Sequence, residues 1–174
     1  MIYHWHYTTP EGLSDLEMTS DGKFLTGLWF TGSRGAGKHA GPWTDLQLPI
    51  FDETANWLDQ YFQGKQPDFT PNYQIHHLTV FRQEVMDILQ TIPYGQTQTY
   101  GQIAQQIARK QGLSKMSAQA VGGAVGWNPL CILIPCHRVM GAKVALTGYG
   151  GGMANKIALL KLEGHDVSKF KLPK

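Results

Sequence analysis

The pattern of apolar and polar positions changes about halfway along the chain. In the first part, residues 2–7 alternate, with an aromatic residue at every second position, which is typical of a half-buried strand. Two apolar runs, residues 16–18 and 24–30, flank Ser-Asp-Gly, and Asp-Gly between apolar runs is a strong hairpin signal. The N-terminal part is therefore predicted to begin as a small antiparallel sheet.

A helix is predicted to follow this sheet. The apolar positions that recur at helical spacing are Ile50, Trp57, Leu58, Tyr61 and Phe62. Asp52 is expected to cap the N-terminus of this helix, and Gly64 stands where a helix ends. Residues 66–71 contain two prolines and little apolar pattern. We interpret them as the linker between two domains, residues 1–75 and 76–174.

The second part has the periodicity of helices. Thr79 is expected to cap one helix and Thr99 the next, whose apolar residues follow the i, i+3, i+4, i+7, i+8 rule. After a basic turn at residues 109–115, Ser117 is expected to cap a short helix over residues 118–125. This arrangement of helix, turn and helix is typical of nucleic-acid-binding proteins.

The short helix contains Gly122 and Gly123, and each glycine destabilises a helix by roughly 1 kcal/mol relative to alanine. Small residues would allow either a neighbouring helix or a DNA backbone to approach closely, and both explanations stay open. The helix carries no large side chains suited to reading bases in the major groove. Any DNA binding by this helix is therefore expected to show little sequence preference.

The candidate chemistry lies in residues 128–139, where an apolar run ends at Pro135 and is followed by Cys136 and His137. Proline fixes its own φ and donates no backbone hydrogen bond, so it ends the run and places the cysteine in a turn. A neighbouring imidazole can take the proton of the thiol, and the thiolate is a nucleophile. A buried, inert cysteine fits the same spacing.

The only other cysteine is Cys131. If the run between it and Cys136 is extended, the two lie ~16 Å apart on opposite faces, which is too far for a disulfide. Free thiols are typical of a reducing cytoplasm. No apolar run approaches the length of a membrane span, and no signal peptide is recognisable. We therefore expect a cytoplasmic protein without a membrane segment.

Composition and charge add one feature to this picture. The chain has 174 residues, of which 42% are hydrophobic and 16% charged, as in a soluble globular protein. Residues 1–77 carry 4 Lys and Arg against 9 Asp and Glu, a net charge of −5, whereas residues 78–174 carry 11 against 4, a net charge of +7. A basic half suggests contact with a polyanion, although chance segregation of charge on a solvated surface would give the same counts.

Two apparent ligand-binding motifs lack the residues that their chemistry needs. Residues 32–38 have the spacing of a phosphate-binding loop, but His39 follows the lysine in place of Ser or Thr, and a Gly-Pro pair at residues 41–42 cannot begin the required helix. A flexible surface loop is the better interpretation. His76 and His77 have no cysteine or carboxylate at ligand spacing, so no metal site is predicted.

Several of these stretches together resemble one family. Residues 134–139, Ile-Pro-Cys-His-Arg-Val, resemble the active-site signature of the O6-alkylguanine-DNA alkyltransferases, also called methylated-DNA–protein-cysteine methyltransferases. The resemblance spans residues 79–165 and includes, in order, Thr99-Tyr100, residues 120–124, Asn128-Pro129, Tyr149 and Glu163-Gly164-His165. It implies an α+β fold, with a small antiparallel, ribonuclease H-like N-terminal domain and a winged-helix-like C-terminal domain that contains the helix-turn-helix.

The resemblance also implies the activity, that of a methylated-DNA–[protein]-cysteine S-methyltransferase (EC 2.1.1.63). Such a protein moves an alkyl group from O6-alkylguanine, or from O4-alkylthymine, in double-stranded DNA irreversibly to its own cysteine. The implied partner is DNA bound through the minor groove by a monomer. The implied reaction needs no cofactor and no metal.

The resemblance assigns a role to each site residue. Cys136 is the acceptor, His137 a base acting through a water molecule, Glu163 the group that orients the imidazole, and Asn128 a brace for the active-site segment. The residues implied in contact with the base or the DNA are Tyr100, Gln119, Val125, Tyr149, Gly150 and Gly151. The chain departs from the family at Gln119, where arginine is common, at Gly150, where many members have serine, and at Trp127, where a small residue is usual.

Two other functions use the same residues. A cysteine hydrolase with Cys136, His137 and Glu163 would turn over many times, and the basic helix-turn-helix argues against it. A sensor that binds alkylated DNA without repairing it would lack the cysteine, and Cys136 argues against that function.

Overall fold

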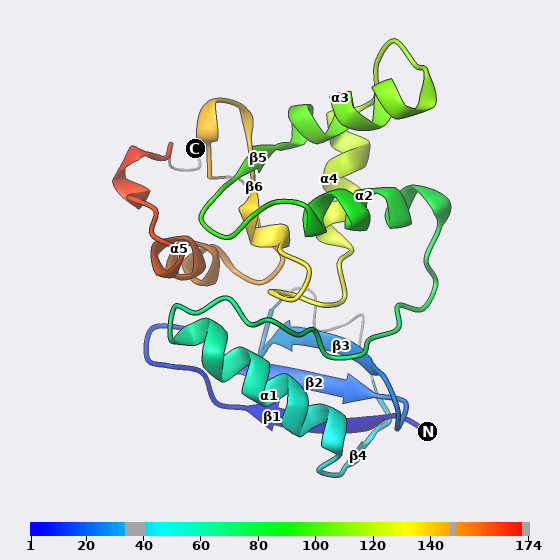
Figure 1. Ribbon diagram of the computed structural model, residues 1–174, viewed down its shortest axis with the longest axis vertical. Coiled ribbons are helices and arrows are strands. Elements are labelled where there is room, and N and C mark those ends of the chain that lie inside the picture. Colours follow the sequence, from blue (N-terminus) through cyan, green and yellow to red (C-terminus); the bar gives the residue numbers. More distant parts are fainter. Residues whose placement is uncertain (34–40, 147–148, 172–174) are drawn as a thin grey trace.

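The computed structural model describes residues 1–33, 41–146 and 149–171. The motif at residues 32–38 lies mostly outside these ranges. In Figure 1 the sheet and α1 form the lower part of the molecule, and the remaining helices form the upper part. None of the described helices is both long and apolar enough to cross a membrane.

The sheet contains four strands in the order β3-β2-β1-β4. The predicted hairpin is confirmed, because β2 (Leu16–Ser20) pairs antiparallel with β3 (Leu25–Phe30) and with β1 (Tyr3–Tyr7). The prediction of a purely antiparallel sheet is wrong in one respect, since the short β4 (Thr44–Asp45) pairs parallel with β1. A long connection from β3 returns the chain to the far edge of the sheet, and only such a connection permits a parallel pair.

Helix α1 (Pro49–Phe62) crosses one face of the sheet (Figure 1). Asp52 was expected to be its N-cap, and this prediction is wrong. The helix begins three residues earlier at Pro49, whose fixed φ suits the first helical position. Asp52 lies in the first turn and accepts a hydrogen bond from the Gln47 side chain at 2.8 Å. The predicted end is confirmed, because Gly64 follows the helix with a φ of 82°.

The upper part contains α2 (Val80–Gln90), α3 (Tyr100–Gln111), α4 (Ala118–Gly126) and α5 (Met153–Leu162). The N-caps predicted for α2, α3 and α4 are all confirmed. The hydroxyls of Thr79 and Ser117 accept hydrogen bonds from backbone N–H groups in the first turns of α2 and α4. Thr99 forms a capping box with Gln102 at the start of α3, which satisfies two N–H groups that the helix itself leaves unpaired.

Short elements connect the helices of the upper part. The strands β5 (Gln98–Thr99) and β6 (Val139–Met140) form a two-stranded parallel sheet. The described residues also include the single turns of 3₁₀ helix η2 (Cys136–Arg138), η3 (Ala142–Val144) and η4 (Val167–Lys169). The candidate nucleophile Cys136 therefore begins a helical turn that follows Pro135 directly.

One hydrophobic core runs through both parts of the molecule. It joins Phe30 of the sheet and Phe51 of α1 to Ile103 of α3 and to Leu130 of the segment before the cysteine. The backbone is continuous across the same seam. Leu28 of β3 donates a hydrogen bond to the Pro129 carbonyl at 2.9 Å and accepts one from the Cys131 N–H at 2.9 Å. The active-site segment is thus attached to the edge of the N-terminal sheet.

Candidate active site

The segment before Cys136 is a tight turn, and the expectation of an extended run there is wrong. The Ile134 N–H donates to the Leu130 carbonyl at 3.0 Å, and the Leu133 N–H donates to the Cys131 carbonyl at 2.8 Å. Ile132 has a φ of 72°, a left-handed conformation that a β-branched residue rarely adopts. The turn brings the side chains of Cys131 and Cys136 within hydrogen-bonding contact, although neither forms a disulfide.

Asn128 holds this turn together. Its Nδ2 donates to the Ile134 carbonyl at 2.8 Å and more weakly to the Leu130 carbonyl at 3.4 Å, while its Oδ1 accepts from the Leu130 N–H at 3.0 Å. These bonds satisfy backbone groups that the turn would otherwise leave buried and unpaired. They also stabilise the unfavourable conformation of Ile132, since a strained residue persists only where its surroundings determine it.

The environment of Cys136 favours its thiolate. The thiol is buried, and its Sγ lies 3.8 Å from the hydroxyl of Tyr149. The hydrogen bond from Cys131 is the largest influence on its pKa. Burial opposes this influence, but Asn128, the charge of His137 and Tyr149 add to it, and together they lower the pKa of Cys136 to about 6. At neutral pH the side chain is therefore mostly the nucleophilic form.

His137 and Glu163 form a buried pair beside the cysteine. His137 Nε2 lies 2.6 Å from Glu163 Oε2, and both side chains are fully buried. Arg138 donates to both carboxylate oxygens, from Nε at 2.8 Å and from Nη2 at 3.1 Å. Burial acts to raise the pKa of Glu163, but the hydrogen bonds and charges of His137 and Arg138 outweigh it and hold this pKa well below its usual range.

The second ring nitrogen of His137 has a different environment. Its Nδ1 is buried and has no hydrogen-bond partner among the residues that the structure describes. Buried polar atoms of this kind usually bind a water molecule. The imidazole thus has one nitrogen committed to Glu163 and one that can exchange a proton.

Several residues that contact this site were not identified from the sequence. They are Cys131, Arg138, Tyr61 of α1, whose hydroxyl lies 2.6 Å from Glu163 Oε2, and Lys156 of α5. The Lys156 side chain is fully buried and donates to the Val139 carbonyl at 2.6 Å, and burial lowers its pKa to about 8. One signal for Lys156 was available, because it lies seven residues before Glu163 and therefore on the same helical face.

The loop that carries Tyr149 packs tightly on one side and is open on the other. A Cβ atom placed on Gly151 would lie 2.6 Å from the Tyr149 ring and 2.9 Å from the Phe30 ring, closer than real Cβ contacts. A Cβ on Gly150 would meet no atom within 4 Å. Gly151 thus allows the buried Tyr149 ring to lie over the site, whereas Gly150 faces open space.

We expect Gly151→Ala to slow the reaction of Cys136 about tenfold or more, because the added methyl must displace the Tyr149 ring that contacts Sγ. Overpacking of this kind also destabilises a protein by about 1–3 kcal/mol. Single-turnover kinetics and thermal unfolding would measure the two effects. Gly150→Ala is the matched control and should leave both the reaction rate and the stability close to those of the wild type. Equal behaviour of the two variants would contradict this interpretation.

A hollow lies at the predicted DNA-binding helices. It has a volume of about 780 Å³ and is lined by Tyr100 at the start of α3 and by Gln119, Gly122 and Gly123 of α4, among others. A Cβ on Gly123 would meet nothing within 4 Å, and one on Gly122 would come no closer than 3.8 Å to the Tyr100 ring. Close packing within the protein therefore does not explain the two glycines. The helix instead presents an open, small-residue surface.

Three residues of α4 and of the position after it have distinct environments. Gln119 is exposed on α4. Val125 is 4% exposed and belongs to the hydrophobic core on the inner face of α4. Trp127, which follows α4, is covered by the guanidinium of Arg82, 4.1 Å from the ring centroid. The bulky residue at position 127 is thus accommodated by a cation–π contact with α2.

The fold and the site define a DNA-binding protein with a reactive cysteine beside a His–Glu pair, and the comparisons with known proteins identify its family. The family described as "6-O-methylguanine DNA methyltransferase, DNA binding domain" matches residues 80–165. Methylated-DNA–protein-cysteine methyltransferases from Haemophilus influenzae and Mycobacterium leprae are similar. The first is 36% identical and covers 93% of this chain and 86% of its own length, and the second is 44% identical and covers 67% of each.

A solved structure agrees with these matches. The crystal structure of Mycobacterium tuberculosis OGT in complex with DNA superposes with a TM-score of 0.78 at 36% identity, covering 97% of this chain and 95% of the other. The chain belongs to the methylated-DNA–protein-cysteine methyltransferase family. It is accordingly a DNA-repair methyltransferase with a mixed α+β fold.

Proposed function

We propose that Cys136 accepts a methyl or larger alkyl group from O6-alkylguanine, and less readily from O4-alkylthymine, in double-stranded DNA. The observation that carries this proposal is the buried Cys136 next to the hydrogen-bonded pair of His137 and Glu163, in a chain of this family. The pKa of Cys136, lowered to about 6 mainly by Cys131, supplies the thiolate at neutral pH. A Cys–His–Glu arrangement of this kind follows the logic of a catalytic triad.

The bonds and protons of this reaction are accounted for without an added cofactor. The Sγ thiolate attacks the alkyl carbon, a C–S bond forms, and the electron pair of the broken C–O bond stays on the base oxygen. His137 takes the thiol proton through a water at Nδ1, and Glu163 stabilises the resulting imidazolium. A proton then returns to the displaced base. Because the thioether has no route back to a thiol, each molecule reacts once.

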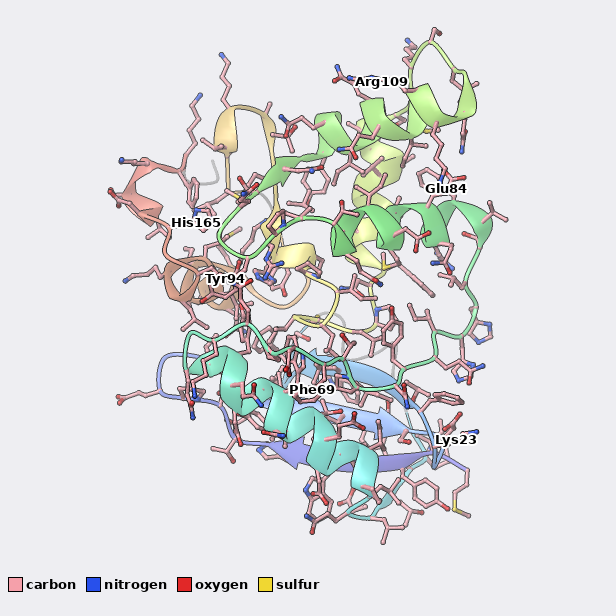
Figure 2. All side chains as sticks on the ribbon, viewed as in Figure 1. Lys23, Phe69, Glu84, Tyr94, Arg109 and His165 are labelled. Atoms are coloured by element: carbon pink, nitrogen blue, oxygen red, sulfur yellow. The ribbon has the colours of Figure 1, made fainter. Side chains whose placement is uncertain are left out.

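The DNA would lie along α4, whose open surface allows a backbone to approach closely. We propose contact through the minor groove, with the damaged nucleotide flipped out past Tyr100 and with Gln119 beside the vacated stack. Extruding a base costs a few kcal/mol and costs less for a poorly paired damaged base. The exposed Arg109, at the end of α3 (Figure 2), with Lys110 and Lys115 would contact phosphates without sequence preference.

The same proposal extends to organisation and location. We infer a ribonuclease H-like domain over residues 1–75 and a winged-helix-like domain over residues 76–174, in which the β5–β6 pair lies beside α3 and α4. The shared hydrophobic core supports a fixed arrangement of the two. A monomer suffices for the site, since every group of the Cys–His–Glu set comes from one chain. The reduced thiols fit a cytoplasmic protein.

Incubation with a duplex that carries labelled O6-methylguanine tests the function. Intact mass should show the addition of one methyl group per protein molecule, and peptide mapping should place it on Cys136. Cys136→Ala should take up no label, whereas Cys131→Ala, which removes the neighbouring thiol, should still accept one methyl group. Release of free methyl product with repeated turnover would favour a hydrolase and contradict the proposal.

A further inference from the structure

The seam between α1 and the reactive site contains a tyrosine that the catalytic set does not include. Tyr61 comes from the last turn of α1, in the N-terminal part, yet its hydroxyl donates to Glu163 Oε2 at 2.6 Å and lies 3.5 Å from His137 Nε2. The same carboxylate oxygen accepts the bond from His137 at 2.6 Å. Arg138 Nη2 also donates to this oxygen, at 3.1 Å. Three donors from different parts of the molecule therefore share one acceptor atom, and Tyr61 is the one that comes from α1.

The Tyr61 ring is held in place from several sides. Trp57 stacks on it with centroids 5.5 Å apart and an interplanar angle of 6°, and Tyr94 meets it edge-on at 6.2 Å. Tyr94 lies between α5 and α1 (Figure 2), and its own hydroxyl donates to the carbonyl of Leu162, the residue before Glu163. The direction of the Tyr61 hydroxyl is thus determined by packing, and only 2% of the residue is exposed.

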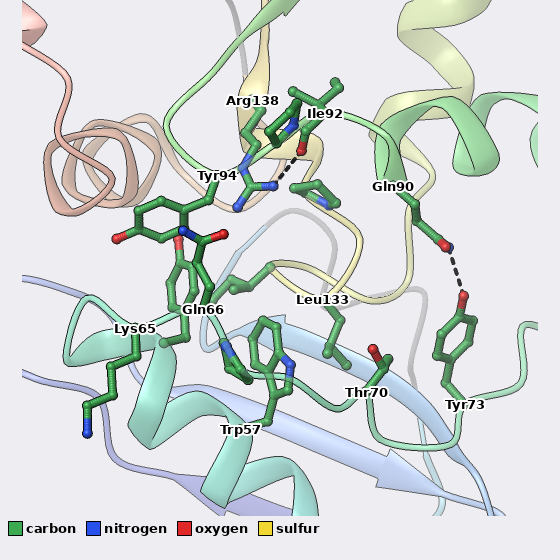
Figure 3. A pocket seen from close by; sticks show the side chains of 15 residues that line it. Trp57, Lys65, Gln66, Thr70, Tyr73, Gln90, Ile92, Tyr94, Leu133 and Arg138 are labelled. Atoms are coloured by element: carbon green, nitrogen blue, oxygen red, sulfur yellow. Dashed lines mark hydrogen bonds between the residues drawn. The ribbon is translucent and has the colours of Figure 1, made fainter.

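A solvent-connected pocket adjoins this seam (Figure 3). It has a volume of about 310 Å³ and is lined by Trp57, Tyr61, Tyr94, Pro135 and Arg138, among others, whereas Cys136 does not line it. The pocket is therefore separate from the place where an alkyl group must reach Sγ. Tyr61 approaches the His137–Glu163 pair from the side of this pocket.

We propose that Tyr61 is a positioning residue that shares Glu163 Oε2 with His137 and so moderates the hydrogen bond between His137 and Glu163. This inference rests on the proposed function of the Cys136–His137–Glu163 set. Each further donor on a carboxylate oxygen withdraws negative charge from it, so the hydrogen bond to His137 is weaker than it would be without Tyr61. Tyr61 thereby keeps the imidazole able to release its proton after the thiolate has formed.

The other charged and titratable groups around Tyr61 are compatible with this role. They are His137 and Arg138 from η2, Glu163 after α5 and Tyr94 from the loop after α2. Burial, followed by the charge and hydrogen bond of Glu163, raises the pKa of Tyr61 well above its ordinary value. The phenol therefore keeps its proton and acts as a donor over the whole working pH range.

The test is the pH dependence with which iodoacetamide alkylates Cys136 in the full chain, followed by mass spectrometry of the peptide. Loss of the phenol donor in Tyr61→Phe strengthens the His137–Glu163 bond and stabilises the imidazolium. We expect the inflection of the rate to move to lower pH by about half a unit or more. Tyr7→Phe is the matched control, because it removes an equally short tyrosine–carboxylate bond, 2.6 Å to Asp59, and should cause no shift.

A second variant tests the same role in case Tyr61→Phe does not fold. Replacement of Tyr61 by 3-fluorotyrosine keeps the ring and makes the hydroxyl a stronger donor, so the inflection should move to higher pH. Opposite shifts for the two changes would support the role of Tyr61. An unchanged inflection, or shifts in the same direction for both, would overturn it. Iodoacetamide needs no DNA, so this outcome is independent of whether methylated DNA transfers its methyl group to Cys136.

Discussion

Glu163→Gln is expected to abolish most of the alkyl transfer and to destabilise the protein by about 3–5 kcal/mol, the usual cost of removing one partner of a buried ion pair. The carboxylate accepts hydrogen bonds from Tyr61, His137, Arg138 and the Gly95 N–H, at distances from 2.6 to 3.3 Å. An amide offers only one acceptor oxygen and directs two hydrogens toward these donors. The partly buried Arg138 also loses its counter-charge.

The expected loss of rate follows from the orientation of His137. Replacing the carboxylate by an amide in a Ser–His–Asp triad lowers the rate about 10⁴-fold, because the imidazole takes the wrong tautomer. We expect about 10²- to 10⁴-fold here, since Cys131 and Tyr149 still stabilise the thiolate. Single-turnover transfer from a methylated duplex and denaturant unfolding would measure the two effects. Asp59→Asn, which weakens the bond from Tyr7, is the control and should change neither by much.

Acid titration provides a further check on Glu163. Because its pKa is held below the ordinary value, Glu163 contributes its full stabilisation above pH ~4.3 and loses it as the pH falls toward the folded-state pKa. Glutamine does not titrate. The difference in unfolding free energy between wild type and Glu163→Gln should therefore be constant above about pH 5 and should shrink below about pH 4. A difference independent of pH would contradict the assigned ion pair.

Cys131→Ala is expected to raise the pH at which Cys136 reacts. The hydrogen bond from Cys131 is the main cause of the lowered pKa, which is about 6 against an ordinary value of 9.0. In wild type the rate should therefore rise tenfold per pH unit below about pH 6 and reach a plateau above about pH 7. Without this donor the inflection moves upward. Each unit by which this pKa rises above 7 lowers the rate at pH 7 by about tenfold.

Cys131→Ser separates this donor from simple packing. The serine hydroxyl can still donate to the thiolate and is smaller than a thiol, so it should restore most of the wild-type profile. The rate of methyl transfer across pH 5 to 9, for all three proteins, would measure the inflection. Identical profiles for Cys131→Ala and wild type would show that the thiolate does not depend on Cys131.

Much of the fold follows from local patterns in the sequence. The alternation at residues 2–7 predicted β1, and the Asp-Gly turn between two apolar runs predicted β2 and β3. Hydroxyl residues before helical periodicity predicted the starts of α2, α3 and α4. These signals depend on residues a few positions apart, and the backbone conformations they favour are the same in any tertiary context. The start of α1 was misplaced because Asp52 and Pro49 both suit a helix N-terminus, and the proline prevailed.

The candidate site residues could also be proposed from the chain, since the Pro-Cys-His-Arg motif and Glu-Gly-His resemble the family signature. What the sequence could not determine was their surroundings. Cys131 contacts Cys136 because residues 131–134 turn back, and they do so because Leu28 of β3 and the Asn128 side chain take up their backbone hydrogen bonds. An isolated apolar run carries no sign of such distant partners.

Tyr61 illustrates the same limit. Its helical spacing identified it only as a buried residue of α1, and 102 positions separate it from the carboxylate that its hydroxyl contacts. The sequence by itself therefore indicated the candidate nucleophile and determined the family and most helix and strand boundaries, which depend on short-range patterns. Only the tertiary structure decided which donors surround Cys136 and Glu163, because buried polar groups take their partners from whichever element packing brings within reach.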